Sequence, residues 1–220
     1  MNALMNILAD PSEAFEQIKG KPRWFVPNLF CVITLFAVIW LGGCWRDIGD
    51  GFSPGRILGP ALISLLIVGI VSVGSSLFLY LMILLVGGTI DAAPRFRSIF
   101  ALNIHCAVIL LLGEVFNLLL ICSNVFGDLD LPLTNRFPVG LDLLFFLTGN
   151  PGIYLAVLFH CTSVFVLWYL VVLARGIRAF TGSSMLRSRV VAASLWSAAV
   201  LFVMCMVYAA GGGTTIRIVL

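Results

Sequence analysis

Three polar residues in one long apolar run could do chemistry inside a membrane. In a helix, the 11 and 14 steps from Asn103 to Glu114 and Asn117 turn the chain by about +20° and −40°, so the three fall near one face. An ionisable group at this depth costs about 2.5–3.5 kcal/mol, and Glu114 should therefore face the bundle interior. It could serve as a proton or ion ligand, or hydrogen-bond a neighbouring helix. We favour the packing role, because no second buried charge is available as a relay partner.

Two further pairs, His105-Cys106 and His160-Cys161, also fall in apolar runs. Two histidines and two cysteines could hold a tetrahedral zinc ion. However, adjacent residues on a helix point about 100° apart, so one pair cannot readily turn both side chains to one ion. We interpret His105 and His160 as polar residues at helix contacts. No G-x-G-x-x-G, Walker A, H-E-x-x-H or G-x-S-x-G pattern occurs, and we expect no catalytic residues, no metal and no cofactor.

Composition indicates where these residues lie. Of 220 residues, 61% are hydrophobic and only 10% are charged, whereas a soluble domain carries about 25% charged residues. This predicts an all-α, polytopic membrane helix bundle in a cell's inner (cytoplasmic) membrane. The net charge of +3 is too small to indicate nucleic acid as a partner. Five apolar runs are long enough to span a bilayer, at about 26–44, 60–86, 96–122, 152–174 and 190–210.

Basic residues predict the orientation of the five spans. Nine of the 13 basic residues fall on the side of the membrane that carries the N-terminus: Lys19, Lys21, Arg23, Arg95, Arg97, Arg175, Arg178, Arg187 and Arg189. The other side has four: Arg46, Arg56, Arg136 and Arg217. Because cytoplasmic loops carry the excess of Lys and Arg, the N-terminus is predicted to be cytoplasmic. Residues 211–220 would then form an external tail.

The segment 1–25 precedes the first span and is predicted to hold a short amphipathic helix. Asp10 suits the N-cap, Pro11 the first helical position, and Gly20 the end of the helix. Phe15 and Ile18 share its apolar face. This helix could lie on the bilayer surface or pack on the membrane domain itself. Acidic residues and prolines here are unlike a cleavable signal, so the first span should remain in the mature protein.

Two features of the external side stay open. The apolar stretch Val139–Thr148 is too short to cross a bilayer, which favours an interfacial or re-entrant helix. Cys44 and Cys122 would both lie near the outer ends of their spans, and the sequence does not decide whether they form a disulfide. On the bundle side, Ser72-x-x-x-Ser76 and Ala193-x-x-x-Ser197 predict faces where helices pack closely.

Two groups of residues resemble a known family. They are the run Asp10-Pro-Ser-Glu-Ala-Phe15-Glu-Gln-Ile18 with Pro22, Trp24 and Pro27, and later Trp168, Leu170, Leu173, Gly176, Ile177, Thr181-Gly182 and Ser184. The pattern resembles bacterial Yip-domain proteins, of the Rab/Ypt-interacting Yip family. The resemblance implies a five-span membrane domain without known catalytic residues. Eukaryotic relatives serve vesicle traffic and carry a long soluble N-terminal region, which this sequence lacks. Some bacterial relatives look like accessory partners of ABC-type exporters.

The function we expect is that of a non-enzymatic membrane scaffold or accessory protein. It would bind lipids, other membrane proteins or a second copy of itself. The cytoplasmic residues expected to bind partners or lipids are Asp10, Phe15, Trp24, Arg175, Arg178 and Arg187. The arginines could meet anionic headgroups, or they could only fix the topology. The alternative is a small transporter or channel-like protein with a polar site around Glu114, Asn103 and Asn117.

Overall fold

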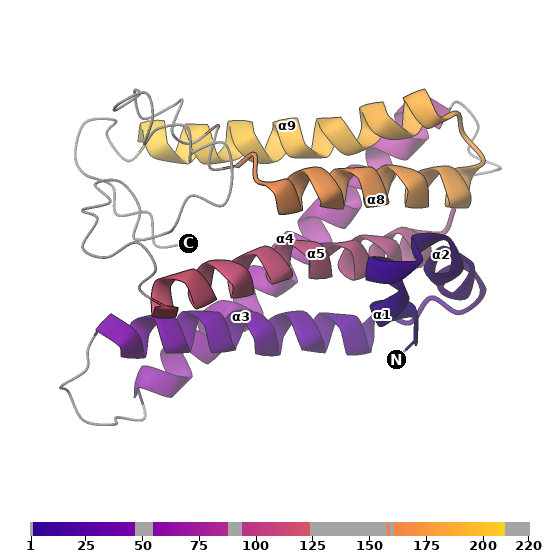
Figure 1. Cartoon of the computed structure of the whole chain (residues 1–220). Helices are drawn as coiled ribbons and strands as arrows, with labels where there is room; N and C mark the ends of the chain where they lie inside the picture. The colour runs from indigo at the N-terminus through magenta and orange to yellow at the C-terminus, as the bar shows by residue number, and fades with distance from the viewer. Residues whose placement is uncertain (1, 47–54, 88–93, 124–157, 159–160, 210–220) are drawn as a thin grey trace.

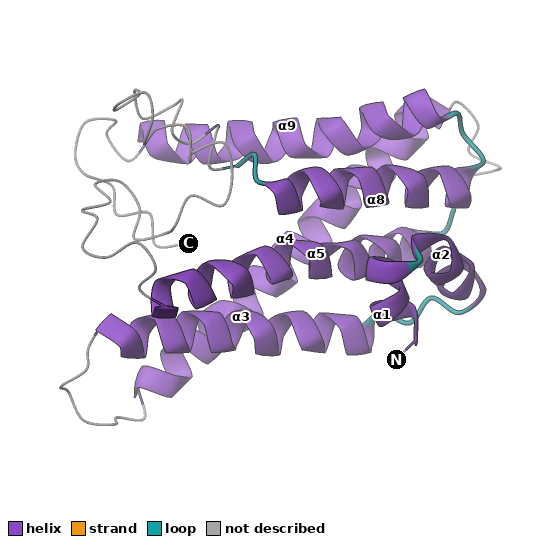
Figure 2. Cartoon of the chain, in the orientation of Figure 1, coloured by secondary structure: helices purple, strands orange, loops and turns teal. Residues whose placement is uncertain are grey.

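The computed structural model describes residues 2–46, 55–87, 94–123, 158 and 161–209 (Figure 1). Every regular element in these residues is a helix (Figure 2). In chain order the helices are α1 (Asn2–Ala9), α2 (Pro11–Gly20), α3 (Phe25–Arg46), α4 (Gly55–Gly87), α5 (Phe96–Ser123), α8 (Val164–Thr181) and α9 (Met185–Ala209). The all-α class predicted from composition is confirmed for this part of the chain.

Four helices lie side by side in one layer, and α4 crosses behind them (Figure 1). Neighbours within the layer follow the order α3, α5, α8, α9, and α4 contacts α3, α5 and α9. At 1.5 Å per residue the 33 residues of α4 measure about 50 Å, more than the ~30 Å of hydrocarbon in a bilayer. The oblique crossing of α4 is how a helix of this length fits the bilayer.

The surface of the bundle is apolar where a soluble protein would be polar. Along α4, Leu62, Leu66 and Ile70 are all more than half exposed. Within the described residues, four helices are long and apolar enough to cross a membrane: Leu58–Val86, Phe96–Leu119, Val164–Thr181 and Met185–Ala209. The chain is therefore a multi-pass helical membrane protein. The remaining one of the five predicted spans corresponds to α3, whose 22 residues, Phe25–Arg46, are also enough to cross a bilayer.

The fourth predicted span differs from the structure at both ends. We predicted one helix over 152–174, but residues 161–163 are not helical and α8 begins at Val164. The Ser163 side chain accepts a hydrogen bond from the Val166 N–H at 3.2 Å, so it caps the helix there. At the other end α8 continues to Thr181, because Gly182 takes the left-handed conformation (φ 65°) that ends a helix.

These boundaries move four arginines out of the loop where the sequence placed them. Arg175 and Arg178 lie on the last turns of α8, and Arg187 and Arg189 lie on the first turns of α9. All four remain exposed. The sequence placed these arginines between two spans, and the structure places them on the consecutive ends of α8 and α9, on either side of the turn at Gly182.

The predicted start and end of α2 are confirmed. The Asp10 carboxylate accepts hydrogen bonds from the Ser12 and Glu13 N–H groups at 3.1 and 3.4 Å, Pro11 follows it, and the helix ends at Gly20. The preceding helix α1 was not predicted. Its last turn closes when the Asp10 N–H donates to the Asn6 carbonyl at 2.7 Å. We call α1 and α2 together the N-terminal cap.

Several sequence predictions lie outside the described residues. They concern the short helix at Val139–Thr148, the side chain of His160, the possible Cys44–Cys122 disulfide and the external tail 211–220.

Candidate functional site

The N-terminal cap packs on the helix bundle through its apolar face. Ala14, Phe15 and Ile18 are buried, and α2 contacts α8 and α5 while α1 contacts α5. Of the two positions open for the amphipathic helix, the structure has the one packed on the membrane domain. Phe15, predicted as a binding residue, is therefore part of the core rather than of a surface.

Gly176 on α8 is where the cap and two helices come closest together. A Cβ atom at this position would lie 2.5 Å from Leu102 Cδ1 on α5 and 3.0 Å from Phe15 Cε1 on α2. Leu102 is fully buried, so it has little room to move. The absence of a side chain at Gly176 is thus what lets α2, α5 and α8 meet.

The outer face of this end is charged. On α2 the exposed residues include Glu13, Glu16 and Lys19, while Arg175 and Arg178 are exposed on the adjoining α8. Asp10 is exposed too, but its carboxylate is engaged as the helix cap. The apolar side of the cap is buried against the bundle, and its charged side is exposed. This end of the bundle therefore presents a polar surface.

Trp24 lies at the base of this surface, just before α3. Its ring packs edge-on against Phe25 and Phe100, with centroid separations of 6.1 and 5.6 Å, and it is half-buried. A tryptophan with one dry edge and one exposed edge is typical of the membrane–water boundary. Arg187, the last of the predicted surface residues, is exposed on α9.

Asn103 joins three helices through its side-chain amide. Its Nδ2 donates to Ser75 Oγ at 2.7 Å and to Ser76 Oγ at 2.9 Å on α4, and its Oδ1 accepts from the Tyr169 hydroxyl on α8 at 2.9 Å. Asn103 and Ser76 are buried, as is Tyr169. This geometry favours the packing interpretation for Asn103, because its amide is committed to neighbouring helices.

The side-chain partners of Asn103 are Ser75, Ser76 and Tyr169, and the other polar residues predicted on α5 are not among them. Asn117 is buried and Glu114 is partly exposed, four turns and three turns along the helix. His105 is buried, and its Nδ1 lies 2.7 Å from the Ala101 carbonyl oxygen one turn earlier on the same helix. Cys106 is fully buried in the apolar core. In the described residues, no three His, Cys, Asp or Glu side chains come together as metal ligands would.

Sequence reasoning missed two members of the Asn103 cluster. Ser72 and Ser76 were singled out on α4, but Ser75 was not, although its hydroxyl bonds Asn103. Tyr169 was missed because its partner is 66 residues away in the sequence. The available signal was chemical: a tyrosine hydroxyl inside an apolar helix needs a hydrogen-bond partner.

The turn between α8 and α9 is held by hydroxyl groups. Thr181 Oγ1 donates to the Ile177 carbonyl at 2.7 Å and lies 2.8 Å from Ser183 Oγ, which in turn lies 2.9 Å from Ser188 Oγ. Together with the left-handed Gly182, these bonds fix a tight reversal. The Thr181-Gly182 pair is thus a structural feature of the turn.

The comparison with protein families decides the class of this bundle. The family model of the Yip1 domain matches residues 5–207. This chain belongs to the Yip1 domain family. No curated protein and no solved structure gives a significant match.

The Yip1 motifs quoted from the sequence have structural roles here. Asp10 and Pro11 begin α2, and Thr181 and Gly182 close the turn after α8. Phe15 and Gly176 are far apart in the sequence, yet they meet where the N-terminal cap docks on α8. These motifs of the Yip1 domain therefore hold one end of the bundle together.

Proposed function

We propose that this Yip1-domain protein is a non-enzymatic scaffold or accessory protein whose capped end binds another membrane protein or lipid headgroups. The Yip1 family is a membrane-protein family and not an enzyme family. The observation that carries the proposal is the cap itself: its apolar side is buried against α5 and α8, and its charged side faces outward. A rigid, charged platform at a bundle end suits recognition of a partner.

The proposal includes five spans with the N-terminus in the cytoplasm of a prokaryotic cell. Support comes from where the basic residues lie. All nine residues predicted for the cytoplasmic side belong to the cap and its linker, the start of α5, the end of α8 or the start of α9. These elements share one end of the bundle (Figure 1). By the positive-inside rule that end faces the cytoplasm.

The partners we propose are a membrane transport or trafficking component, such as an ABC-type exporter, or a second copy of this chain. The charged rows on α2 and α8 would give such contacts their specificity, because opposite charges on a partner fix its register. The exposed arginines Arg175 and Arg178 are on α8 and the exposed acidic residues Glu13 and Glu16 are on the adjoining α2, so a partner with both charge signs is favoured.

A photo-crosslinking amino acid placed at Glu13 or Arg178 tests this proposal in native membranes. Both positions are exposed on the capped end. We expect each to capture the same protein or lipid species, and a crosslinker at Leu66, exposed on the apolar face of α4, to miss it. Capture of identical species at all three positions, or nothing enriched at the capped end, would contradict the scaffold function.

Transport through a site at Glu114 receives no specific support from the geometry. The amide of Asn103 is occupied by Ser75, Ser76 and Tyr169. Among the described residues, a pocket of about 590 Å³ opens beside the N-terminal cap, and neither Glu114 nor Asn117 lines it. We therefore do not adopt the transport alternative.

A further inference from the structure

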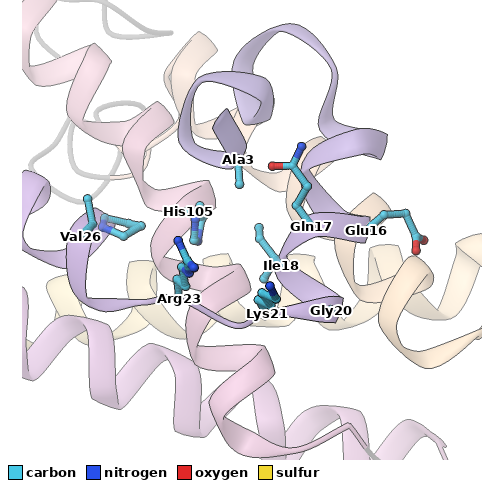
Figure 3. A pocket seen from close by; sticks show the side chains of 10 residues that line it. Ala3, Glu16, Gln17, Ile18, Gly20, Lys21, Arg23, Val26 and His105 are labelled. Atoms are coloured by element: carbon cyan, nitrogen blue, oxygen red, sulfur yellow. The ribbon is translucent and has the colours of Figure 1, made fainter. Parts of the chain in front are cut away.

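A pocket of about 590 Å³ lies between the N-terminal cap, the linker that follows it and the helices α3 and α5 (Figure 3). This volume is within the range of ligand sites, about 300–1,000 Å³. Three charged side chains line it, Glu16 from α2 and Lys21 and Arg23 from the linker, and His105 reaches it from α5. None of the functions derived above uses His105.

The pocket lies at the start of the apolar helix α3. Val26 and Pro27 line the pocket from the first turn of α3, and Trp24 directly precedes this helix in the sequence. Tryptophan and arginine at the start of an apolar helix mark the headgroup layer. We therefore expect the pocket to open among lipid headgroups.

Backbone hydrogen bonds order the linker that carries the two cationic residues of the pocket. The Lys21 N–H donates to the Gln17 carbonyl at 3.0 Å, and the Arg23 N–H donates to the Lys21 carbonyl at 2.8 Å. Two cationic side chains against the single carboxylate of Glu16 give the lining a net positive charge. An arginine fork and a lysine ammonium are the groups that recognise phosphate oxygens.

His105 adds a hydrogen-bond acceptor to the pocket. Its Nδ1 lies 2.7 Å from the Ala101 carbonyl oxygen, and because a carbonyl only accepts, Nδ1 carries the proton. In the neutral ring, Nε2 then holds the lone pair. His105 is buried among apolar neighbours, so a ligand with a hydroxyl donor satisfies this nitrogen better than one without.

An apolar track leads away from the pocket along α3. Val26, which lines the pocket, and Phe30 and Ile33 beyond it are exposed at spacings of four and three residues. Such spacing puts them on one face of the helix. A ligand whose polar end fills the pocket can thus lay a hydrocarbon chain along this face.

We propose that this pocket binds the headgroup of an anionic glycerophospholipid. The phosphate lies against Lys21 and Arg23, headgroup hydroxyls donate to His105 Nε2, and an acyl chain follows Val26, Phe30 and Ile33. A choline headgroup fits poorly, because it offers no donor to His105 and adds a cation beside Lys21 and Arg23. The inference deepens the proposed function by naming the lipid class bound at the capped end.

Native mass spectrometry of the purified full chain tests this site with phosphatidylglycerol and phosphatidylcholine as probes. We expect retained phosphatidylglycerol to exceed phosphatidylcholine, and the double change Lys21→Gln with Arg23→Gln to lower its retention about tenfold. The matched control is Arg95→Gln with Arg97→Gln, two exposed arginines at the start of α5 outside the pocket. It should stay within about twofold of the unchanged protein.

Two further arms separate the possible outcomes. His105→Phe should reduce the preference for phosphatidylglycerol over phosphatidylcholine. This variant and the Lys21→Gln with Arg23→Gln variant should both keep their thermal unfolding temperature in detergent without added lipid. Free glycerol 3-phosphate should compete only weakly; strong competition would identify a soluble phosphate ester and overturn the lipid assignment. Equal loss in the arginine control, or no preference in the unchanged protein, would also overturn it. Protein crosslinks at Arg178 would persist in that case. The scaffold proposal would then stand although the lipid site had failed, so the two tests are independent.

Discussion

Gly176 is the residue at which the packing of the capped end can be tested most directly. Gly176→Ala adds a methyl group 2.5 Å from Leu102 Cδ1 and 3.0 Å from Phe15 Cε1. Because Leu102 and Phe15 are buried, overpacking should lower the free energy of unfolding by about 1–3 kcal/mol. Unfolding by SDS in mixed micelles measures the difference.

The control for this change is Gly74→Ala on α4. Gly74 is exposed, and no neighbouring atom lies within 4 Å of a Cβ atom at that position. Alanine also has the higher helix propensity. The control should therefore be neutral or slightly stabilising, and equal destabilisation of both variants would show that Gly176 is not a special contact.

Tyr169 is the residue that ties α8 to the Asn103 amide. Tyr169→Phe keeps the ring but removes the hydroxyl that donates to Asn103 Oδ1 at 2.9 Å. The buried amide oxygen then lacks this donor, at a cost of about 1–2 kcal/mol in unfolding free energy. Tyr208→Phe is the control, since Tyr208 is 74% exposed, and it should change stability by less than about 0.5 kcal/mol.

A double-mutant cycle shows whether that cost belongs to the Tyr169–Asn103 bond. Combining Tyr169→Phe with Asn103→Ala should cost less than the sum of the single changes, because both remove the same hydrogen bond. Additive effects would mean that the two side chains act independently, and the cluster would then not couple α5 with α8.

At the scale of the elements, the N-terminal cap is held mainly by its own apolar face. Phe15→Ala removes the buried ring that meets Gly176. We expect α1 and α2 to lose amide hydrogen-exchange protection while α5 and α9 keep theirs, because small docked elements open below the global free energy of unfolding. Hydrogen exchange read by mass spectrometry resolves the segments.

The exposed Lys19 supplies the comparison for the cap. Lys19→Ala leaves the buried face of α2 intact, so the exchange of residues 2–20 should be unchanged. Loss of protection throughout the bundle in Phe15→Ala would instead show that the cap is part of the cooperative core.

The elements also show how far the sequence could be used to predict this fold. Asp10, Pro11 and Gly20 carry local signals, and they placed α2 correctly. The long apolar runs are also a local signal, and they identified the long helices. Contacts between helices carry no local signal: the meeting of Phe15 with Gly176 and of Tyr169 with Asn103 depends on tertiary packing. The apolar run marked a span to about 174, whereas α8 continues to Thr181 and ends at the left-handed Gly182.

For the candidate site the same division applies. The sequence singled out Asn103 and His105 as polar groups in an apolar helix, and both are buried. It could not show that Asn103 bonds α4 and α8, nor that His105 shares a pocket with Lys21 and Arg23. The Asn103 bonds arise from the packing of α5 against α4 and α8, and the shared pocket arises where the cap packs on α5, which brings together residues about eighty positions apart in the sequence.

At the scale of the whole molecule, the position of α3 decides the number of spans. Cys31 of α3 packs in one buried apolar cluster with Val68 of α4 and with Ile104 and Val108 of α5. A helix that shares a core with two membrane-spanning neighbours lies at their depth. This supports a span for α3, whose 22 residues, Phe25–Arg46, are long enough to cross a bilayer.

Reporter fusions test that count and the orientation together. With α3 crossing and the N-terminus inside, a fusion after Gly87 should report the cytoplasm, and fusions after Ser123 and at the C-terminus should report the outside. Fluorescent-protein and alkaline-phosphatase reporters distinguish the two sides. If α3 does not cross, four spans remain and both chain ends lie on one side. That result would also move the charged cap, the nine basic residues and the headgroup pocket relative to the membrane, because all of them share the end where α3 begins.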